Sequence, residues 1–112
     1  MYIGIPSEGP SLDDMMSPRF ARAPWFLIVD TEGNLVEAVD NEAKQAAHGA
    51  GGVAVQILAD KSVSVVFAPR VGPKASASLQ MAKMKVYEIT GVSCREAFGK
   101  YKEGGLREVP LG

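Results

Sequence analysis

Near residue 49 the spacing of apolar residues changes from that of strands to that of helices. Before this point, residues 2–6, 25–30 and 35–40 form short apolar runs that predict β-strands. Residues 31–34 are typical of a turn, because glycine and asparagine accept a positive φ. The second and third strands are therefore expected to form an antiparallel hairpin, and the first strand to extend it into a meander.

After this point helical and strand patterns alternate. Residues 63–68 and 85–89 have the apolar, β-branched composition of strands. A helix is expected to precede the first of them, because its apolar residues recur at the spacing of one helix face. These residues are Ala50, Val53, Ala54, Ile57 and Leu58.

Two further helix starts are marked by local signals. Gly72-Pro73 places a proline in a first helical turn, and Ser93 has capping-box spacing with Glu96. The predicted order is therefore βββαβαβα. Strands joined by helical crossovers pair in parallel, so we expect an α/β fold with a mixed five-stranded sheet flanked by helices.

Length and charge exclude several classes of protein. The chain has 112 residues, which suits one domain. We expect the domain to span residues 1–106 and residues 107–112 to form a flexible tail after Gly104-Gly105. Lys and Arg together number 12, and Asp and Glu 13. This balance argues against a general nucleic-acid or anionic-membrane binder. We see no signal-peptide pattern and no apolar run long enough to span a membrane.

The chain contains one cysteine, Cys94, and one histidine, His48. These two residues cannot form an internal disulfide or a tetrahedral Cys/His zinc site. A single cysteine fits a reducing, cytoplasmic setting. Each residue also has a plain structural interpretation: Cys94 as a small buried side chain, and His48 as a helix-capping or surface residue. No acidic cluster of the kind that a metal-dependent hydrolase needs stands out.

The predicted topology brings the loops at residues 7–24, 41–48, 69–72 and 90–93 to one edge of the sheet. Open α/β sheets bind ligands at the carboxyl ends of their strands. Three helix N-termini are also expected there, with their N–H groups and partial positive charge. Five cations lie in or beside these loops: Arg19, Arg22, Arg70, Lys74 and Arg95. We therefore predict an anionic ligand. For Arg19 and Arg22, solvated surface charge is an equally simple interpretation.

Three segments resemble a known family. Residues 17–26 (SPRFARAPWF) resemble the S-x-H-F-G-R-A-P-x-F signature of the dinitrogenase iron–molybdenum cofactor biosynthesis family. Residues 48–51 (HGAG) resemble its H-G-A-G helix start, and residues 72–75 (GPKA) its G-x-G-P-K-A segment. The likeness spans residues 1–106. The chain departs from the signature at Arg19, where the family often has histidine, and at Ala21, where it has glycine.

The resemblance implies a ribonuclease H-like three-layer fold with strand order 3-2-1-4-5. It also implies a non-catalytic carrier of an anionic iron–sulfur or iron–molybdenum cofactor precursor, working with cofactor-assembly proteins and with neither nucleic acid nor membrane. Such a cluster brings its own sulfides, so one or two protein ligands are enough. His48 and Cys94 are the expected metal ligands. The other expected cofactor-binding residues are Arg19, Arg22, Gly49, Gly51, Arg70, Gly72 and Lys74, with His48 among them as well.

A second hypothesis uses the same residues. In it the chain is a regulatory module that binds a partner protein or a small anion at the same edge of the sheet. Because Arg19 replaces a potential imidazole ligand with a cation, this departure from the family pattern favours the second hypothesis.

Overall fold

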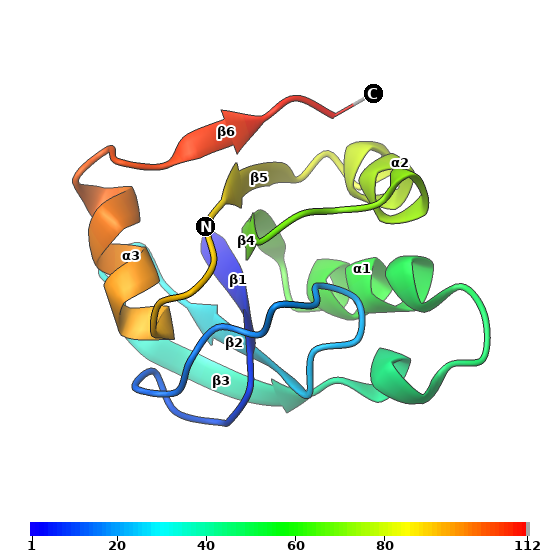
Figure 1. Ribbon diagram of the computed structural model, residues 1–112, viewed down its shortest axis with the longest axis horizontal. Helices are drawn as coiled ribbons and strands as arrows, with labels where there is room; N and C mark the ends of the chain where they lie inside the picture. The colour runs from blue at the N-terminus through cyan, green and yellow to red at the C-terminus, as the bar shows by residue number, and fades with distance from the viewer. Residues whose placement is uncertain (112) are drawn as a thin grey trace.

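Six strands form one mixed sheet in the computed structural model, which describes residues 1–111 (Figure 1). Their order across the sheet is β3-β2-β1-β4-β5-β6. This confirms the order expected for the first five. The strands are β1 (Tyr2–Ser7), β2 (Trp25–Val29), β3 (Leu35–Asp40), β4 (Val63–Ala68), β5 (Lys85–Glu88) and β6 (Arg107–Val109).

The direction of each strand follows from its connection. The chain reverses direction between β1 and β2 through a long loop and between β2 and β3 through a short turn. β2 therefore pairs antiparallel with both β1 and β3. β4 pairs parallel with β1, and β5 parallel with β4. The turn between β2 and β3 is the predicted one: Gly33 has φ +87° and the Asp30 carboxylate accepts the N–H groups of Glu32 and Asn34, both at 2.9 Å. The carboxyl ends of β1, β3, β4 and β5 therefore share one edge.

The sixth strand corrects the expectation of a five-stranded sheet, and it is formed by residues that were expected to belong to a tail. Residues 107–109 pair antiparallel with β5, with Val109 beside Val86 and Arg107 beside Glu88. A three-residue strand has no pattern of its own. It forms because β5 would otherwise expose the unpaired backbone groups of a sheet edge. Gly112 lies outside the described residues.

Helices cover both faces of the sheet (Figure 1). A 3-10 helix, η1 (Glu42–Gln45), and two α-helices, α1 (Ala50–Asp60) and α2 (Pro73–Met81), pack on one face. The remaining helix, α3 (Cys94–Lys102), packs on the other. Each face has its own apolar cluster: Phe26, Leu58 and Val66 lie in the α1–α2 cluster, and Ile5 and Phe67 in the α3 cluster. Within residues 1–111, the helices are all too short or too polar to traverse a lipid bilayer.

Candidate functional site

The N-termini of α1 and α2 lie side by side. A Cβ atom built on Gly51 would lie 3.2 Å from the Cα atom of Ala75, so the first turns of the two helices are in close contact. Residues 48 and 49 lead into α1, and residues 72 and 74 begin α2. The two glycine-containing helix starts predicted from the sequence are thus at the same end of the molecule.

Neither of these helix starts is capped by a side chain. Gly49, with φ +70°, is the N-cap of α1, and Gly72 is the N-cap of α2. Neither first turn contains an acidic residue. The backbone N–H groups of a first helical turn lack partners within their own helix. Those of α1 and α2 therefore remain available to an anion.

The N-terminus of α3 was also expected to be open to an anion, but other segments close it. The Ser93 hydroxyl oxygen accepts the N–H of Glu96 at 3.1 Å, as the capping-box spacing predicted. The N–H groups of Cys94 and Arg95 donate to carbonyl oxygens of Asp14 and Leu12, at 3.0 and 2.9 Å. The loop after β1 therefore closes this helix start, and two helix N-termini rather than three are open.

The loop at residues 17–24 carries two arginines over a hollow of about 300 Å³. Arg19 and Arg22 line it together with Glu8, Ser17, Pro18 and Pro24. The Ser17 hydroxyl oxygen accepts the backbone N–H of Arg19 at 3.2 Å, and the Arg22 guanidinium donates to the carbonyl of Lys44 at 3.1 Å. Arg22 thereby joins this loop to η1, close to the start of α1.

Asn41 holds the same two segments together from inside, and sequence reasoning missed it. Its side chain is fully buried. The amide nitrogen donates to the carbonyls of Ala21 and Ala23, at 2.9 and 2.8 Å, and the amide oxygen accepts the N–H of Ala43 at 3.0 Å. A lone asparagine in a polar connection carries no signal of burial, because burial depends on which segment folds over it.

Four cations at this end have no carboxylate partner within residues 1–111. Arg19, Arg22, Arg70 and Lys74 make none of the ion pairs found there, and all four are exposed. We call these four residues the basic rim. The segments that carry them contribute to one apolar cluster, through side chains that include Phe20, Val71 and Ala75. Arg95, the fifth expected cation, instead pairs with Asp13 at 2.9 Å.

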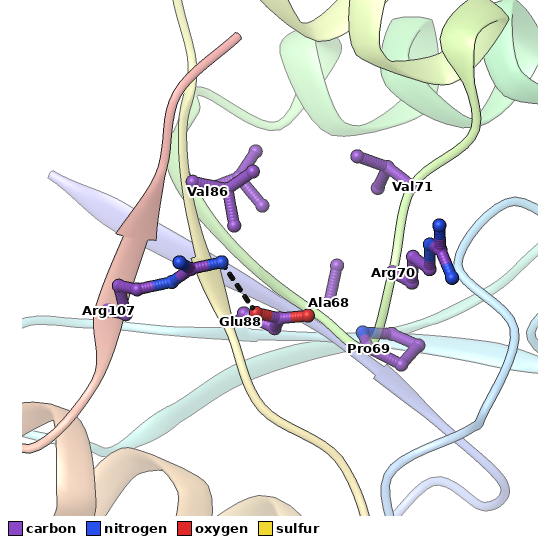
Figure 2. A pocket seen from close by; sticks show the side chains of 8 residues that line it. Ala68, Pro69, Arg70, Val71, Val86, Glu88 and Arg107 are labelled. Atoms are coloured by element: carbon purple, nitrogen blue, oxygen red, sulfur yellow. Dashed lines mark hydrogen bonds and ion pairs between the residues drawn. The ribbon is translucent and has the colours of Figure 1, made fainter.

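A second hollow, of about 210 Å³, lies between the β4–α2 loop and β6 (Figure 2). Arg107 and Glu88 form an ion pair at its side, with 3.2 Å between Nη2 and Oε1. Arg70 contributes to its wall, but its guanidinium points away from the centre (Figure 2). The remaining lining is largely apolar: Ala68, Pro69, Val71, Val86 and Val109. The charge of Arg70 is therefore directed away from this hollow.

His48 and Cys94, the two expected metal ligands, are not brought together. Cys94 is fully buried in the α3 cluster, because it lies on the apolar face of that helix. His48 is exposed and precedes α1, on the opposite face of the sheet. Burial raises the pKa of the Cys94 thiol, which disfavours the thiolate that a metal would need. In the described part of the chain, no group of three or more His, Cys, Asp or Glu side chains could hold a metal ion.

Comparison with known proteins decides the family. Residues 1–104 match the family model described as dinitrogenase iron-molybdenum cofactor. The chain belongs to this family. A match over nearly the whole chain agrees with the three motif segments, and the family fits a role in the biosynthesis or binding of the iron–molybdenum cofactor.

Solved structures and a curated relative extend the comparison. The apo form of the orange protein from Desulfovibrio gigas is 36% identical, with a TM-score of 0.93, over 98% of this chain and 93% of that one. A NifB-like protein from Thermotoga is 44% identical, with a TM-score of 0.83, over 96% and 91%. An uncharacterized protein of Methanocaldococcus jannaschii is 27% identical over 111 residues, which are 96% of this chain and 91% of the relative.

Proposed function

We propose that this protein is a non-catalytic carrier that holds an anionic iron–sulfur or iron–molybdenum cofactor precursor against the basic rim. The observation that carries the proposal is the meeting, at one end of a protein of this family, of four cations without carboxylate partners and two uncapped helix starts. Charge of this kind holds an anion without enclosing it.

Each residue of the site has a distinct role in this proposal. The basic rim neutralises the negative charge of the cluster. Gly49 and Gly72 let the cluster approach the backbone N–H groups because the space at their Cβ positions is open, and Gly51 brings the two helix starts together. His48, which is exposed beside these glycines, supplies one displaceable imidazole ligand. A preassembled cluster brings its own sulfides and needs few protein ligands. Cys94, buried on the other face, is outside the proposed site.

The solved relatives support a binding role. The orange protein, 36% identical over nearly all of both chains, is described in its apo form, and the Thermotoga relative is described as NifB-like. These descriptions concern those proteins. For this chain they agree with a site that receives a prebuilt group and releases it again. We expect the exchange to take place in the cytoplasm with cofactor-assembly proteins.

An anaerobic titration tests the proposal. Purified protein is titrated with a preassembled iron–sulfur cluster, and the cluster absorbance is followed at low and high salt. We expect saturable binding that Arg19→Ala/Arg70→Ala weakens about a hundredfold or more, because each of the two lost charge-assisted contacts contributes about 1.5–3 kcal/mol. The affinity of this variant should also depend less on salt. His48→Ala should release the cluster faster.

Arg95→Ala is the control for loss of a surface arginine, because it removes one positive charge from a residue outside the basic rim that is already paired with Asp13. Its cluster affinity should equal that of the wild type. Equal affinity in all four proteins, or no cluster-dependent absorbance in the wild type, contradicts the proposal.

The regulatory alternative keeps the site and changes the ligand. This alternative is favoured by Arg19, a cation at a position where the family resemblance places histidine. A thermal-shift comparison of phosphate and sulfate with the cluster distinguishes the two functions, since a ligand that binds the native state raises Tm. Stabilisation by the metal-free anions alone, lost in Arg19→Ala/Arg70→Ala, supports the alternative.

A further inference from the structure

A cavity of about 210 Å³ lies at the opposite end of the sheet from the basic rim. It is found where β4 and β5 begin, beside the C-terminal half of α3. Among the described residues no carboxylate lines it, whereas two lysines and two tyrosines do. Its lining consists of Met1, Ser64, Val65, Lys83, Lys85, Tyr87 and Tyr101. Neither the family motifs nor the basic rim uses any of these residues.

Ser64 occupies an irregular position in β4. The pairing between β1 and β4 passes from Tyr2↔Val63 to Ile3↔Val65, so Ser64 is an extra residue in a β-bulge. Bulges redirect a side chain and occur often beside binding sites. The Ser64 hydroxyl is buried and has no hydrogen-bond partner within residues 1–111. Since a buried, unpaired hydroxyl is destabilising, rotating it into the cavity to meet a ligand oxygen would be favourable.

Lys83 adopts a backbone conformation that suits glycine better. It has φ +61° in the turn from α2 to β5, where the N–H of Met84 closes the turn on the carbonyl of Leu79 at 3.0 Å. A residue with a Cβ atom is disfavoured in this left-handed region, and glycine is the common choice at this position. A lysine here keeps a cation at the cavity at the expense of local stability.

The tyrosines form an aromatic wall. The Tyr101 ring lies 5.1 Å from that of Tyr87, edge to face, and 5.2 Å from that of Phe67. Lys85 lies two residues before Tyr87 on β5 and is beside Val65 of β4. The cavity thus combines cations, one unsatisfied hydroxyl and flat apolar surface.

We propose that this cavity binds a small organic anion with a planar body. Its carboxylate or phosphate group contacts Lys83, Lys85 and the Ser64 hydroxyl, and its ring lies against Tyr87 and Tyr101. The ligand is not the metal–sulfur cluster, and the site works independently of the basic rim.

An NMR titration of the full chain with benzoate, phenyl phosphate and neutral benzyl alcohol tests this. We expect saturable shifts at Ser64, Lys85, Tyr87 and Tyr101 with at least one of the two anions, with a Kd of about 1 mM or tighter for ligands of this size. The tighter anion identifies the headgroup. Absence of saturable shifts with both anions, or equal shifts with benzyl alcohol, overturns the proposal.

Two variants separate recognition from general charge and from folding. Lys83→Gln should weaken binding about tenfold, as expected for a lost contact to a charged group, whereas Lys102→Gln removes the same charge outside the lining and should leave the Kd unchanged. Ser64→Ala should raise Tm, because it removes an unpaired hydroxyl, and yet weaken binding. Equal losses in the two lysine variants, or a Ser64→Ala protein with unchanged affinity, contradict the assignment.

Discussion

Ser62 and Lys83 are non-glycine residues in the left-handed backbone conformation, with φ of +62° and +61°. They lie just after α1 and α2. The chain reverses at these points to enter β4 and β5. Glycine would make either turn without steric conflict between Cβ and the backbone. The two positions therefore store a small amount of strain at the same end of the sheet.

Lys83→Gly should increase the free energy of unfolding by about 1 kcal/mol, because it removes the left-handed strain at the end of α2. Urea denaturation measures the change. Ser62→Gly, in the equivalent turn after α1, should shift stability in the same direction. A loss of stability in both variants would contradict the assignment of strain to these turns.

The Asp30 carboxylate accepts the hydrogen bonds that close the β2–β3 turn. The hydrogen bond from the backbone N–H of Asn34 does most to lower the pKa of Asp30. Desolvation by burial acts against it, and hydrogen bonds from the backbone of Glu32 and the side chain of Asn34 lower the pKa further. A carboxylate whose pKa is lower in the folded state stabilises the fold above its unfolded-state pKa, and this contribution is lost as pH falls through the folded-state pKa.

Asp30→Asn should therefore be less stable than the wild type at about pH 7, and the difference should shrink toward about pH 2 as the wild-type carboxyl takes up its proton. Denaturant titrations at the two pH values measure the difference. Glu32→Gln changes the net charge equally and lies in the same turn, so it serves as the control. A stability difference of the same size at both pH values would contradict the role of the Asp30 charge.

At the scale of elements, the candidate site depends on how closely α1 approaches α2. Gly51 permits this approach, since its Cβ position is 3.2 Å from the backbone of Ala75. Gly52 is in the same helical turn, but a Cβ there would meet only the Ser78 hydroxyl, at 3.8 Å. The two neighbouring glycines therefore have different tolerance for a side chain.

Gly51→Val should destabilise the protein by about 1–3 kcal/mol, the usual cost of overpacking a tight contact, and should weaken cluster binding by separating the two helix starts. Gly52→Ala should leave binding unchanged and stabilise by up to about 1 kcal/mol, because alanine is the better helix former. Thermal denaturation and the cluster titration measure the two effects. Equal behaviour of both variants would contradict the importance of the α1–α2 contact.

The elements also differ in how far local patterns predict them. The spacing of Ser93 and Glu96 predicts the start of α3, and the structure confirms the cap. The same residues reveal nothing about the loop carbonyls of Asp14 and Leu12 that close this helix N-terminus to ligands. Whether a helix start can bind an anion depends on its tertiary neighbours as well as its own cap.

At the scale of the whole molecule, the sheet separates two ends with different chemistry. The basic rim lies where β1, β3 and β4 finish, and the lysine- and tyrosine-lined cavity lies where β4 and β5 begin. The two faces also differ, because α1 and α2 cover one and α3 the other (Figure 1). This division separates Cys94, in the α3 cluster, from His48, with which it was expected to bind a metal.

Periodicity, caps and turn signals were sufficient to predict the first five strands and the three α-helices along the chain, because these signals are local, and the HGAG and GPKA segments indicated the family. The order of the five strands across the sheet followed from the family resemblance. The sequence was also sufficient to place His48 and Gly72 at one edge, since the predicted strand directions fix which loops share an edge. Only the tertiary structure decided the rest: the pairing of residues 107–109 with β5, the burial of Asn41, the closed start of α3 and the unpaired hydroxyl of Ser64. Each of these depends on how segments distant in the chain pack around the residue, and the residue itself carries no sign of those surroundings.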